Sequence, residues 1–438
     1  MKVRVHTMFL KTVLADGQAE QRVIAEMKAR AAETRGDIEN IVRGIMDDVR
    51  ENGMEAVERY SMRFDKTKPY VISPEVLEKA YNACDPKLRA ALEKAAANIR
   101  DYHEKMMVRT WEYRRSAGAV LGQTVRGLHK VGLYVPGGTA AYPSSVLMNA
   151  IPAKVAGVGE LVMVTPPTDN LSTEVMAAAY IAGVDTVIAV GGTQAIAALT
   201  YGAGFIPQVD KIVGPGNAFV AAAKKLAFGT VDIDMIAGPS EVLVIADHTA
   251  NPTYVAADLL SQAEHDKLAS AVLLTDSMAQ AQAISCEMER QAKALPRWDI
   301  IKESVANYGC AVVFDELTDA CAMANIVAPE HLEICTAAPR ELLPFITNAG
   351  AIFLGQYSPE PLGDYMAGPC HVLPTSGTAR FFSPLSTDTF LKKTSVIEYS
   401  KDELEALSED IIALANAEKL GAHANSVAVR FAEPKEDK

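Results

Sequence analysis

Hydrophobic residues recur every three or four positions through much of the first 110 residues of this 438-residue chain. Apolar residues at this spacing form one face of a helix. We therefore predict helices over 20–35, 37–52 and 86–107. Short β-branched runs, which are typical of strands, are scarce in this part of the sequence. The amino-terminal part is predicted to be mainly helical.

From Gly132 onward, short β-branched runs alternate with glycine-rich turns and alanine-rich segments. Strands that alternate with helices form parallel sheets covered by helices on both faces. The fold class is therefore predicted to be α/β, with two sheet units and a cleft between two lobes. The first set of expected strands covers 132–135, 161–165, 186–190 and 211–213, and the second covers 242–246, 271–275, 310–314 and 351–354.

The chain becomes irregular and proline-rich after Gly355. A helix is expected to begin after Ser400, because Ser400 and Glu403 have the spacing of a capping box. This terminal helical arm could pack on its own lobe or on a neighbouring subunit, and the residues favour neither alternative.

Composition narrows the class of protein. The formal net charge of -13 argues against a nucleic-acid binder and favours a small-molecule ligand. The six cysteines form no Cys-x-x-Cys pair, which is typical of free thiols in a reducing compartment. No apolar run resembles a signal peptide or is long enough to cross a bilayer. We therefore expect a cytoplasmic protein that neither binds nucleic acid nor enters a membrane.

Three glycine turns follow expected strands, at 134–138, 190–194 and 213–217. Turns at the carboxyl ends of parallel strands expose backbone N–H groups that favour phosphate or pyrophosphate. Glycine also allows tight strand-to-helix turns without any ligand. None of the three turns is the Gly-x-Gly-x-x-Gly fingerprint of dinucleotide-binding sites. The turns alone thus leave both interpretations open.

Several of the eight histidines lie beside acids or amides in short polar interruptions of apolar sequence. Gln262 and His265 are three apart on a helix expected to begin at 251–252. They could share a ligand, although a solvated helix end explains them more simply. Glu330 and His331 lie at a helix-to-strand junction, where they could act as two bases or form part of a surface loop.

Three further polar residues are candidates near the carboxyl end. His371 lies in a proline-bounded loop close in sequence to Asp364 and could line the cleft. Glu418 and His423 are five residues apart, about 140° around a regular helix, so each would reach a different part of one ligand. Imidazole and carboxylate together supply a catalytic metal site and a general base near neutral pH. The combination predicts an enzyme.

Longer stretches of the sequence resemble the L-histidinol dehydrogenase family. The resemblance extends from the early helices to His423 in the order of the family. The stretches that carry it are Gly132-Leu-Tyr-Val-Pro-Gly-Gly, Val213-Gly-Pro-Gly-Asn, Ile233-Asp-Met-Ile-Ala-Gly-Pro-Ser-Glu, Ala256-Ala-Asp-Leu-Leu-Ser-Gln-Ala-Glu-His-Asp, Ala328-Pro-Glu-His-Leu and His371-Val-Leu-Pro-Thr-Ser-Gly-Thr-Ala-Arg.

This resemblance implies a zinc- and NAD-dependent homodimer that catalyses the last two steps of histidine biosynthesis, from L-histidinol through L-histidinaldehyde to L-histidine. It implies two incomplete Rossmann-like lobes that resemble the aldehyde dehydrogenase fold, with helical extensions at both ends and an arm exchanged between subunits. The expected parts are an extension over 1–25, a first lobe over 26–131 and 239–385, a second, NAD-contacting lobe over 132–238, and a helical dimerisation arm over 386–438.

The resemblance also implies roles for individual residues. The zinc ligands are expected to be Gln262, His265, Asp364 and His423, which also contact the substrate. Glu330 and His331 match the catalytic pair, and His331 contacts the substrate. Ser240, His371 and Glu418 match further substrate contacts, and Tyr134, Gln194 and Asn217 match contacts to NAD.

The chemistry suits these residue types. Oxidation of a primary alcohol to a carboxylate removes four electrons, so two NAD molecules must react in turn. We expect His331 to take the alcohol proton, Glu330 to activate the water that hydrates the aldehyde, and His331 to act as base again. Zinc with mixed nitrogen and oxygen ligands would anchor the imidazole and amine of the substrate.

One position departs from the family pattern, because Cys370 stands where many members have asparagine. A thiol cannot make the two-sided hydrogen bonds of an amide, which affects the shape of the pocket rather than the reaction. Two alternatives are a paralogous zinc- and NAD-dependent dehydrogenase acting on another small alcohol, such as a sulfonated diol, and a catalytically silent protein that kept the fold. An anionic substrate would require a basic residue in the pocket, and a silent protein would not require the Glu330–His331 pair.

Overall fold

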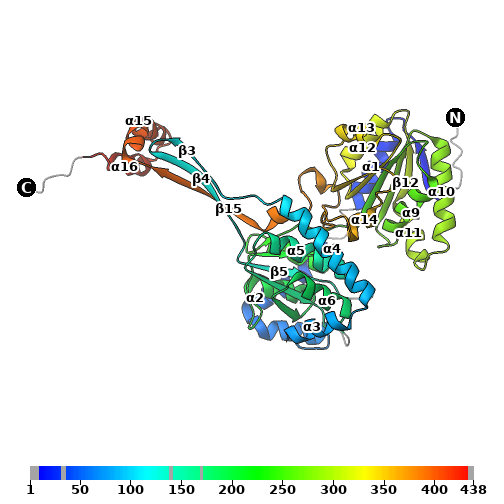
Figure 1. Cartoon of the computed structure of the whole chain (residues 1–438), viewed down its shortest axis with the longest axis horizontal. Helices are drawn as coiled ribbons and strands as arrows, with labels where there is room; N and C mark the ends of the chain where they lie inside the picture. The colour runs from blue at the N-terminus through cyan, green and yellow to red at the C-terminus, as the bar shows by residue number, and fades with distance from the viewer. Residues whose placement is uncertain (1–8, 31–35, 138–141, 168–170, 433–438) are drawn as a thin grey trace, which may run out of the picture. The chain divides into compact units, whose positions relative to one another are not determined.

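The computed structural model describes residues 9–30, 36–137, 142–167 and 171–432 (Figure 1). Its contacts divide the chain into two units, each described by itself below. The first unit comprises Met1–Met107 and Leu128–Phe390, and the second comprises Val108–Gly127 and Leu391–Lys438. The sequence did not predict that residues 108–127 belong to the second unit, because this segment is far in sequence from the rest of that unit.

One six-stranded sheet of the first unit has the order β2-β7-β6-β5-β8-β9. All neighbouring strands are parallel except β2, which runs antiparallel to β7 at the edge. The expected strands are confirmed, whereas the edge strands β2 and β9 were missed, because β2 has only one buried residue and β9 has only two residues. The strands are β2 Tyr70–Ile72, β5 Lys130–Tyr134, β6 Glu160–Thr165, β7 Thr186–Ala189, β8 Lys211–Val213 and β9 Asp232–Ile233.

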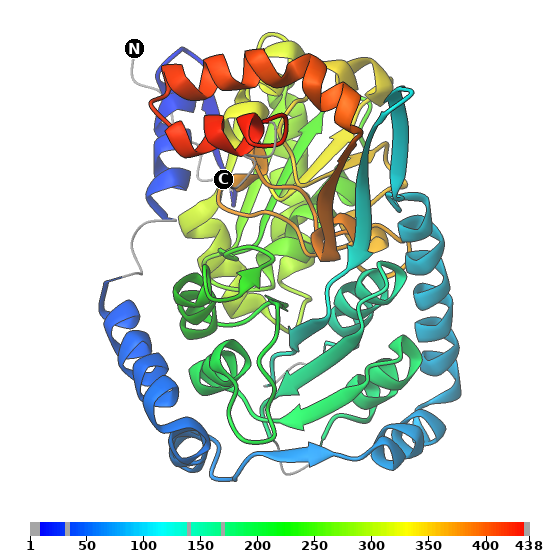
Figure 2. The ribbon, with the colours of Figure 1, turned by 90° about the vertical axis from the view of Figure 1, so that its left-hand side faces the viewer.

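Helices cover both faces of this sheet. The long helix α2 packs on α7 and α8, whereas α3 and α4 pack on α5 and α6 (Figure 2). The α2 helix continues through a non-helical residue at Gly53. The helices are α2 Gly36–Phe64, α3 Pro74–Ala83, α4 Pro86–Lys105, α5 Pro143–Val155, α6 Thr173–Ala182, α7 Gly192–Tyr201 and α8 Ala218–Ala227.

Helices α2 to α4 do not pack on the sheet that we expected. The expected domain boundaries assigned residues 26–131 to the lobe of 239–385. Val42 and Met46 of α2 share a buried cluster with Val162 and Ile188 of the sheet formed by β5 to β9. Helical periodicity shows which face of a helix is buried but not which sheet it packs on. Helices α2 to α4 therefore belong with the sheet that follows them directly in the sequence.

The second six-stranded sheet of the first unit is parallel throughout, in the order β1-β12-β11-β10-β13-β14. The expected strands are confirmed as β10, β11, β12 and the edge strand β14, and β13 begins at the predicted helix-to-strand junction, whereas the edge strand β1 was not predicted. The strands are β1 Lys11–Leu14, β10 Glu241–Ala246, β11 Ser270–Thr275, β12 Gly309–Val313, β13 His331–Cys335 and β14 Ala351–Leu354.

Successive residues of these strands face opposite layers, as strand geometry requires. Val242 and Val244 pack under α9, α10 and α11, whereas Leu243 and Ile245 pack under α1 and α12. The predicted helix over 20–35 is observed as α1 up to Arg30, and 31–35 lie outside the described residues. The helices are α1 Ala19–Arg30, α9 Pro252–Ala263, α10 Met278–Ala292, α11 Trp298–Tyr308, α12 Leu317–Val327, α13 Pro339–Leu342 and α14 Glu360–Tyr365.

The second unit is a three-stranded antiparallel sheet, β15-β4-β3, followed by two helices. The helix after Ser400 is confirmed, and the Ser400 hydroxyl accepts a hydrogen bond from the Glu403 N–H. The expected helical arm over 386–438 also contains a strand, because β15 pairs with β4 along nine residues. The elements are β3 Trp111–Ser116, β4 Ala119–Gly127, β15 Leu391–Tyr399, α15 Lys401–Ala417 and α16 Gly421–Ala428.

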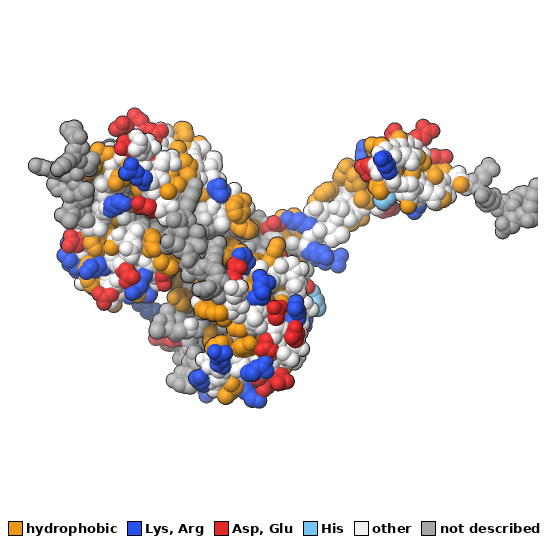
Figure 3. Space-filling view, turned by 180° about the vertical axis from the view of Figure 1, so that it is seen from behind, with side chains coloured by type: hydrophobic (Ala, Val, Ile, Leu, Met, Phe, Trp, Pro, Cys, Tyr) orange, Lys and Arg blue, Asp and Glu red, His pale blue; other side chains and the backbone are white. Residues whose placement is uncertain are grey.

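Charged side chains of both signs lie on the surface of the protein (Figure 3). On the face shown in Figure 3, basic side chains are interspersed with acidic ones, and hydrophobic side chains extend along the second unit. Exposed apolar residues of that unit include Trp111, Tyr113, Ile397 and Leu414. Within the described ranges, no helix combines the length and the apolar composition needed to cross a membrane.

Candidate active site

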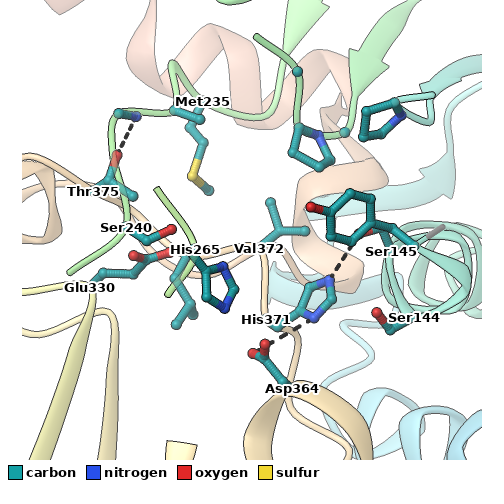
Figure 4. A pocket seen from close by; sticks show the side chains of 18 of the residues that line it. Ser144, Ser145, Met235, Ser240, His265, Glu330, Asp364, His371, Val372 and Thr375 are labelled. Carbon is teal, nitrogen blue, oxygen red and sulfur yellow. Dashed lines mark hydrogen bonds and ion pairs between the residues drawn. The ribbon is translucent and has the colours of Figure 1, made fainter. Parts of the chain in front are cut away.

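A cavity of about 480 Å³ in the first unit collects most of the predicted site residues (Figure 4). The turns after β5 and β8 lie on one side of it, and the residues that precede or begin β10 and β13 lie on the other. One sheet thus contributes its carboxyl edge and the other its amino edge. The predicted residues that line the cavity are Ser240, Gln262, His265, Glu330, His331, Asp364 and His371.

Glu330 and His331 are held by the backbone of a single residue on the neighbouring strand. The Glu241 N–H donates to Glu330 Oε2 at 2.9 Å, and its carbonyl lies 3.0 Å from His331 Nδ1. A carbonyl can only accept, so Nδ1 carries the proton and Nε2 keeps its lone pair. Because His331 begins β13 beside β10, the register of the sheet fixes the orientation of the imidazole.

Burial perturbs both members of this pair. Glu330 is 8% exposed, and desolvation raises the pKa of its carboxyl well above the usual value. Burial also lowers the pKa of His331 to about 4, because the charged imidazolium loses its hydration. His331 is therefore neutral at pH 7 and able to accept a proton. The Glu330 carboxyl keeps its proton to a higher pH than the carboxyl of an exposed glutamate does.

Gln262 and His265 come from the end of α9. The helix begins as expected, with Pro252 in its first turn and the Asn251 side chain accepting from the Thr253 N–H at 3.0 Å. It ends at Ala263, so His265 lies in the turn after the helix, with its N–H donating to the Gln262 carbonyl at 3.2 Å. Both residues nevertheless line the cavity.

The short helix α14 supplies two carboxylates, Glu360 and Asp364. The N–H of Glu360 donates to Glu333 Oε1 at 2.9 Å, which fixes the start of the helix against β13. Glu360 Oε1 lies 3.8 Å from His331 Nε2. Burial and the proximity of Asp364 raise the pKa of Glu360 to about 8, and burial raises the pKa of Asp364 to about 6.

His371 connects this helix to the other side of the cavity (Figure 4). Its Nδ1 lies 3.7 Å from Asp364, and its Nε2 lies 3.5 Å from the Ser145 hydroxyl in the first turn of α5. Burial lowers the pKa of His371 to about 4, so the ring is neutral at pH 7. Cys370 is buried beside it, and its thiol donates to the Met148 carbonyl at 3.2 Å. The thiol thus packs against α5 rather than lining the cavity.

The first unit contains side chains of the types that bind zinc. Ligand atoms of His331, Glu360 and Asp364 lie within 4.8 Å of one another, and Gln262 Oε1 is buried with no hydrogen-bond partner among the described residues. Imidazole nitrogen with carboxylate and amide oxygen is a ligand set that zinc accepts. The remaining predicted ligand, His423, lies on α16 of the second unit, and Glu418 directly follows α15 there.

The three positions expected to contact NAD differ in exposure. Tyr134 and Gln194 are 3% and 1% exposed, and both side chains make hydrogen bonds within the protein. The Tyr134 hydroxyl accepts from the Gly192 N–H at 3.2 Å, and the Gln194 amide donates to Asp65 at 3.2 Å. Asn217 is exposed and caps α8. Gly138, in the first of the glycine turns, lies outside the described residues.

Sequence reasoning missed three contributors to the site. Glu360 was not singled out, although it precedes Asp364 by one helical turn, a spacing that can be seen in the sequence. Lys224 and Asp234 also line the cavity and form a buried ion pair. No pattern in the sequence connects these two residues, because their proximity depends on the packing of α8 against the end of β9.

Comparison with known proteins identifies the family. The family model described as histidinol dehydrogenase matches residues 28–431. The histidinol dehydrogenase of Clostridium acetobutylicum is 50% identical over 424 residues, which cover 96% of this chain and 98% of that protein. The Bacillus subtilis enzyme is 53% identical over 393 residues, covering 89% and 92% of the two chains.

A solved structure agrees with these matches. The crystal structure of histidinol dehydrogenase from Elizabethkingia anophelis superposes with a TM-score of 0.91 at 35% identity and covers 97% of this chain and 99% of that chain. The chain belongs to the histidinol dehydrogenase family. Membership confirms the resemblance stated above, the two-sheet α/β fold, and the prediction of an oxidoreductase of histidine biosynthesis.

Proposed function

We propose that this chain oxidises L-histidinol to L-histidine through L-histidinaldehyde in the cavity of the first unit. The observation that supports this most directly is the buried pair Glu330 and His331, fixed by the two backbone groups of Glu241. The overall reaction consumes one water and two NAD, and it releases two NADH and three protons. Such a sequence requires a base that can act twice and a second group that activates water.

His331 is proposed to be the recurrent base. Its Nδ1–H donates to the Glu241 carbonyl, so Nε2 is the free acceptor. Nε2 would take the alcohol proton in the first oxidation and the hydrate proton in the second. Glu330 is proposed to take a proton from water as it adds to the aldehyde. Burial raises the pKa of this carboxyl well above the usual value, which makes the carboxylate a stronger base than that of an exposed glutamate.

NAD, when bound, accepts one hydride in each of the two oxidations. We propose that it lies against the glycine turns after β5 and β8, with Asn217 in contact. The close approach of Gly214 to the Tyr134 carbonyl, 2.2 Å from the position of an added Cβ, supports a turn built for compact backbone packing. Tyr134 and Gln194 are buried, the Tyr134 hydroxyl accepts from Gly192 and the Gln194 amide donates to Asp65, which favours a role for both side chains in supporting the surface that a cofactor would reach.

Zinc, when bound, would supply a Lewis-acidic centre that fixes the imidazole and amine of the substrate. We propose that Gln262, His265 and Asp364 hold it together with His423, and that Ser240, His371 and Glu418 contact the substrate. The carboxyl groups of Glu330, Glu360 and Asp364 line the cavity, and a cationic substrate would stabilise their ionised forms. Lys224 is the single lysine among its described lining residues, and that ammonium is already paired with Asp234.

We also propose a cytoplasmic homodimer. All six cysteines are free, as expected in a reducing compartment. The second unit exposes Ile397 at 74% and Leu414 at 68% of their surfaces, and burying such residues is a main source of dimer stability. Light scattering should give twice the mass of the chain, and Ile397→Asp with Leu414→Asp should shift the protein toward monomer.

The test of the proposed reaction is NADH formation from limiting L-histidinol, before and after removal and restoration of zinc. We expect two NADH per substrate and activity that the chelator abolishes. His331→Asn should lower kcat by 10²–10⁴-fold, the usual contribution of a general base, while the zinc content stays unchanged. The exposed His129→Asn is the matched control. Unchanged turnover in His331→Asn would refute the assignment of the base, and no NADH from zinc-loaded protein would refute the substrate.

A further inference from the structure

A buried ion pair borders the cavity on the side of the glycine turns. Lys224 belongs to α8, and Asp234 follows β9; their side chains are 3% and 1% exposed, and the ammonium and carboxylate are in direct contact. Both residues line the cavity. The reaction proposed above assigns neither of them a role.

Both partners of the pair hold the same glycine. Lys224 Nζ donates to the Gly214 carbonyl at 2.9 Å, and Asp234 Oδ2 accepts from the Gly214 N–H at 2.9 Å. Gly214 has a φ of +109°, and an added Cβ would lie 2.2 Å from the Tyr134 carbonyl oxygen. The two charged side chains therefore fix a backbone conformation that only glycine can adopt at this position.

This glycine begins the turn from β8 to α8. The turn passes through Pro215 and Gly216, which line the cavity, and ends at Asn217, whose side chain accepts from the N–H groups of Phe219 and Val220 at 3.0 and 3.2 Å. Turns at this place in a parallel sheet present backbone N–H groups and a helix amino terminus to anions.

The same pair fixes a second segment. Asp234 Oδ1 accepts from the Met235 N–H at 2.6 Å, at the start of the segment that leads from β9 to Ser240 and β10. Farther along, the Gly238 N–H donates to the Thr375 hydroxyl at 2.6 Å. The ion pair thus connects the glycine turn to the segment that carries the proposed substrate contact Ser240.

We propose that Lys224 and Asp234 are positioning residues that hold the 214–216 turn in the shape that accepts the pyrophosphate of NAD. This inference rests on the proposed NAD dependence. Lys224 would act through the turn rather than as an anion ligand, because Asp234 already compensates its charge and both side chains are almost fully buried. A buried ion pair adds little net stability compared with apolar residues of similar size, so fixing geometry is the contribution it can make.

The test compares two changes on one helix. The double variant Lys224→Met with Asp234→Asn removes both charges and leaves no buried charge uncompensated. The control is Lys225→Met, the same change at the next residue, whose ammonium is exposed and pairs with Glu39. Lys224→Met alone would leave the Asp234 carboxylate buried without its partner, and we expect it to be strongly destabilised.

NADH binding is measured by fluorescence titration, and the order of the turn by hydrogen exchange of the peptide that covers 213–218. In the double variant we expect the Kd for NADH to rise at least tenfold and exchange of this peptide to become faster. Zinc content should stay within threefold of wild type. The affinity for L-histidinol should fall less than that for NADH, because the amide oxygen introduced at position 234 can still accept from the Met235 N–H. Lys225→Met should match wild type in every measurement.

A folded double variant that binds NADH within twofold of wild type would overturn the inference, as would an equal loss in Lys225→Met. A measurement on wild-type protein covers the case in which the double variant does not fold. NADH should slow exchange of the 213–218 peptide, and unchanged exchange while NADH binds would also overturn the inference. Wild-type protein that makes no NADH from L-histidinol would refute the proposed function alone, because exchange without NADH still reports whether the pair orders the turn.

Discussion

The buried histidine of α4 should make the stability of the first unit depend on pH. His103 is fully buried, and neither ring nitrogen has a hydrogen-bond partner among the described residues. Burial lowers the pKa of this imidazole from 6.5 to about 4. Between these two pH values the imidazole is protonated in the unfolded chain but neutral in the folded chain. The free energy of unfolding therefore falls as the pH drops from about 6.5 toward 4, and the full contribution is present above 6.5.

The size of the effect follows from these two pKa values. At about 1.4 kcal/mol per pKa unit, lowering the pH from 8 to 5 would cost roughly 2 kcal/mol. Water near the ends of the helix screens part of this cost, so we expect about 1–2 kcal/mol. His103→Leu replaces the imidazole with an apolar side chain of similar size and removes both unpaired nitrogens. The variant should then lose about 1–2 kcal/mol less than wild type between pH 8 and pH 5.

The assay is urea unfolding followed by circular dichroism at pH 8 and pH 5 for wild type and His103→Leu. The comparison uses the change of each protein between the two pH values, so any difference in packing at pH 8 cancels. His129→Leu, at an exposed position, controls for the loss of one histidine. Equal pH dependence in wild type and His103→Leu would show that the buried imidazole either keeps its proton or has a partner at low pH.

Three further predictions concern the site and the thiols. Gly214→Ala should lower the melting temperature by at least 5 °C, because its φ of +109° and the 2.2 Å approach to the Tyr134 carbonyl leave no room for a methyl group; a differential scanning fluorimetry trace that matches wild type would contradict this. Gln262→Ala should retain less than a tenth of the zinc after dialysis, measured by atomic emission, whereas full retention would remove Gln262 from the ligand set. An aromatic disulfide reagent should modify one thiol rapidly in the native protein and six after unfolding. Cys286 is exposed, whereas burial raises the pKa of the other five thiols. Two or more rapidly modified thiols would contradict the burial of Cys84, Cys310, Cys321, Cys335 and Cys370.

The sequence was informative wherever one element buries a continuous apolar run. The interior strands of both sheets are such runs, and β10 and β11 are buried at every position. The missed strands lack this signal. Only one residue of the edge strand β2 is buried, and β15 consists largely of exposed residues that alternate without an apolar face. Their pairing partners are far away in the sequence, so local pattern cannot reveal them.

The candidate site could be found from the sequence because its chemistry lies in short polar interruptions of apolar segments. Seven of the residues named from the sequence line one cavity. Glu360 escaped notice because its role depends on contact with His331, and the ion pair of Lys224 and Asp234 depends on how α8 meets the end of β9. Domain boundaries were harder to predict, because they also depend on packing between distant segments. The apolar face of α2 does not specify which sheet it covers.

The placement of the proposed base, His331, at the amino edge of a parallel sheet suits a group that would have to act twice. Val242 pairs with His331 in the register of β10 and β13, so the residue before Val242 lies beside the Glu330–His331 junction. The first backbone groups of β10 then orient both side chains without using any side chain that a substrate must displace. The glycine turns belong to the carboxyl edge of the other sheet. In the proposed reaction, a spent cofactor would leave from one sheet edge while the intermediate, the base and the carboxylates of α14 stay at the other, which is what two successive oxidations at one site require.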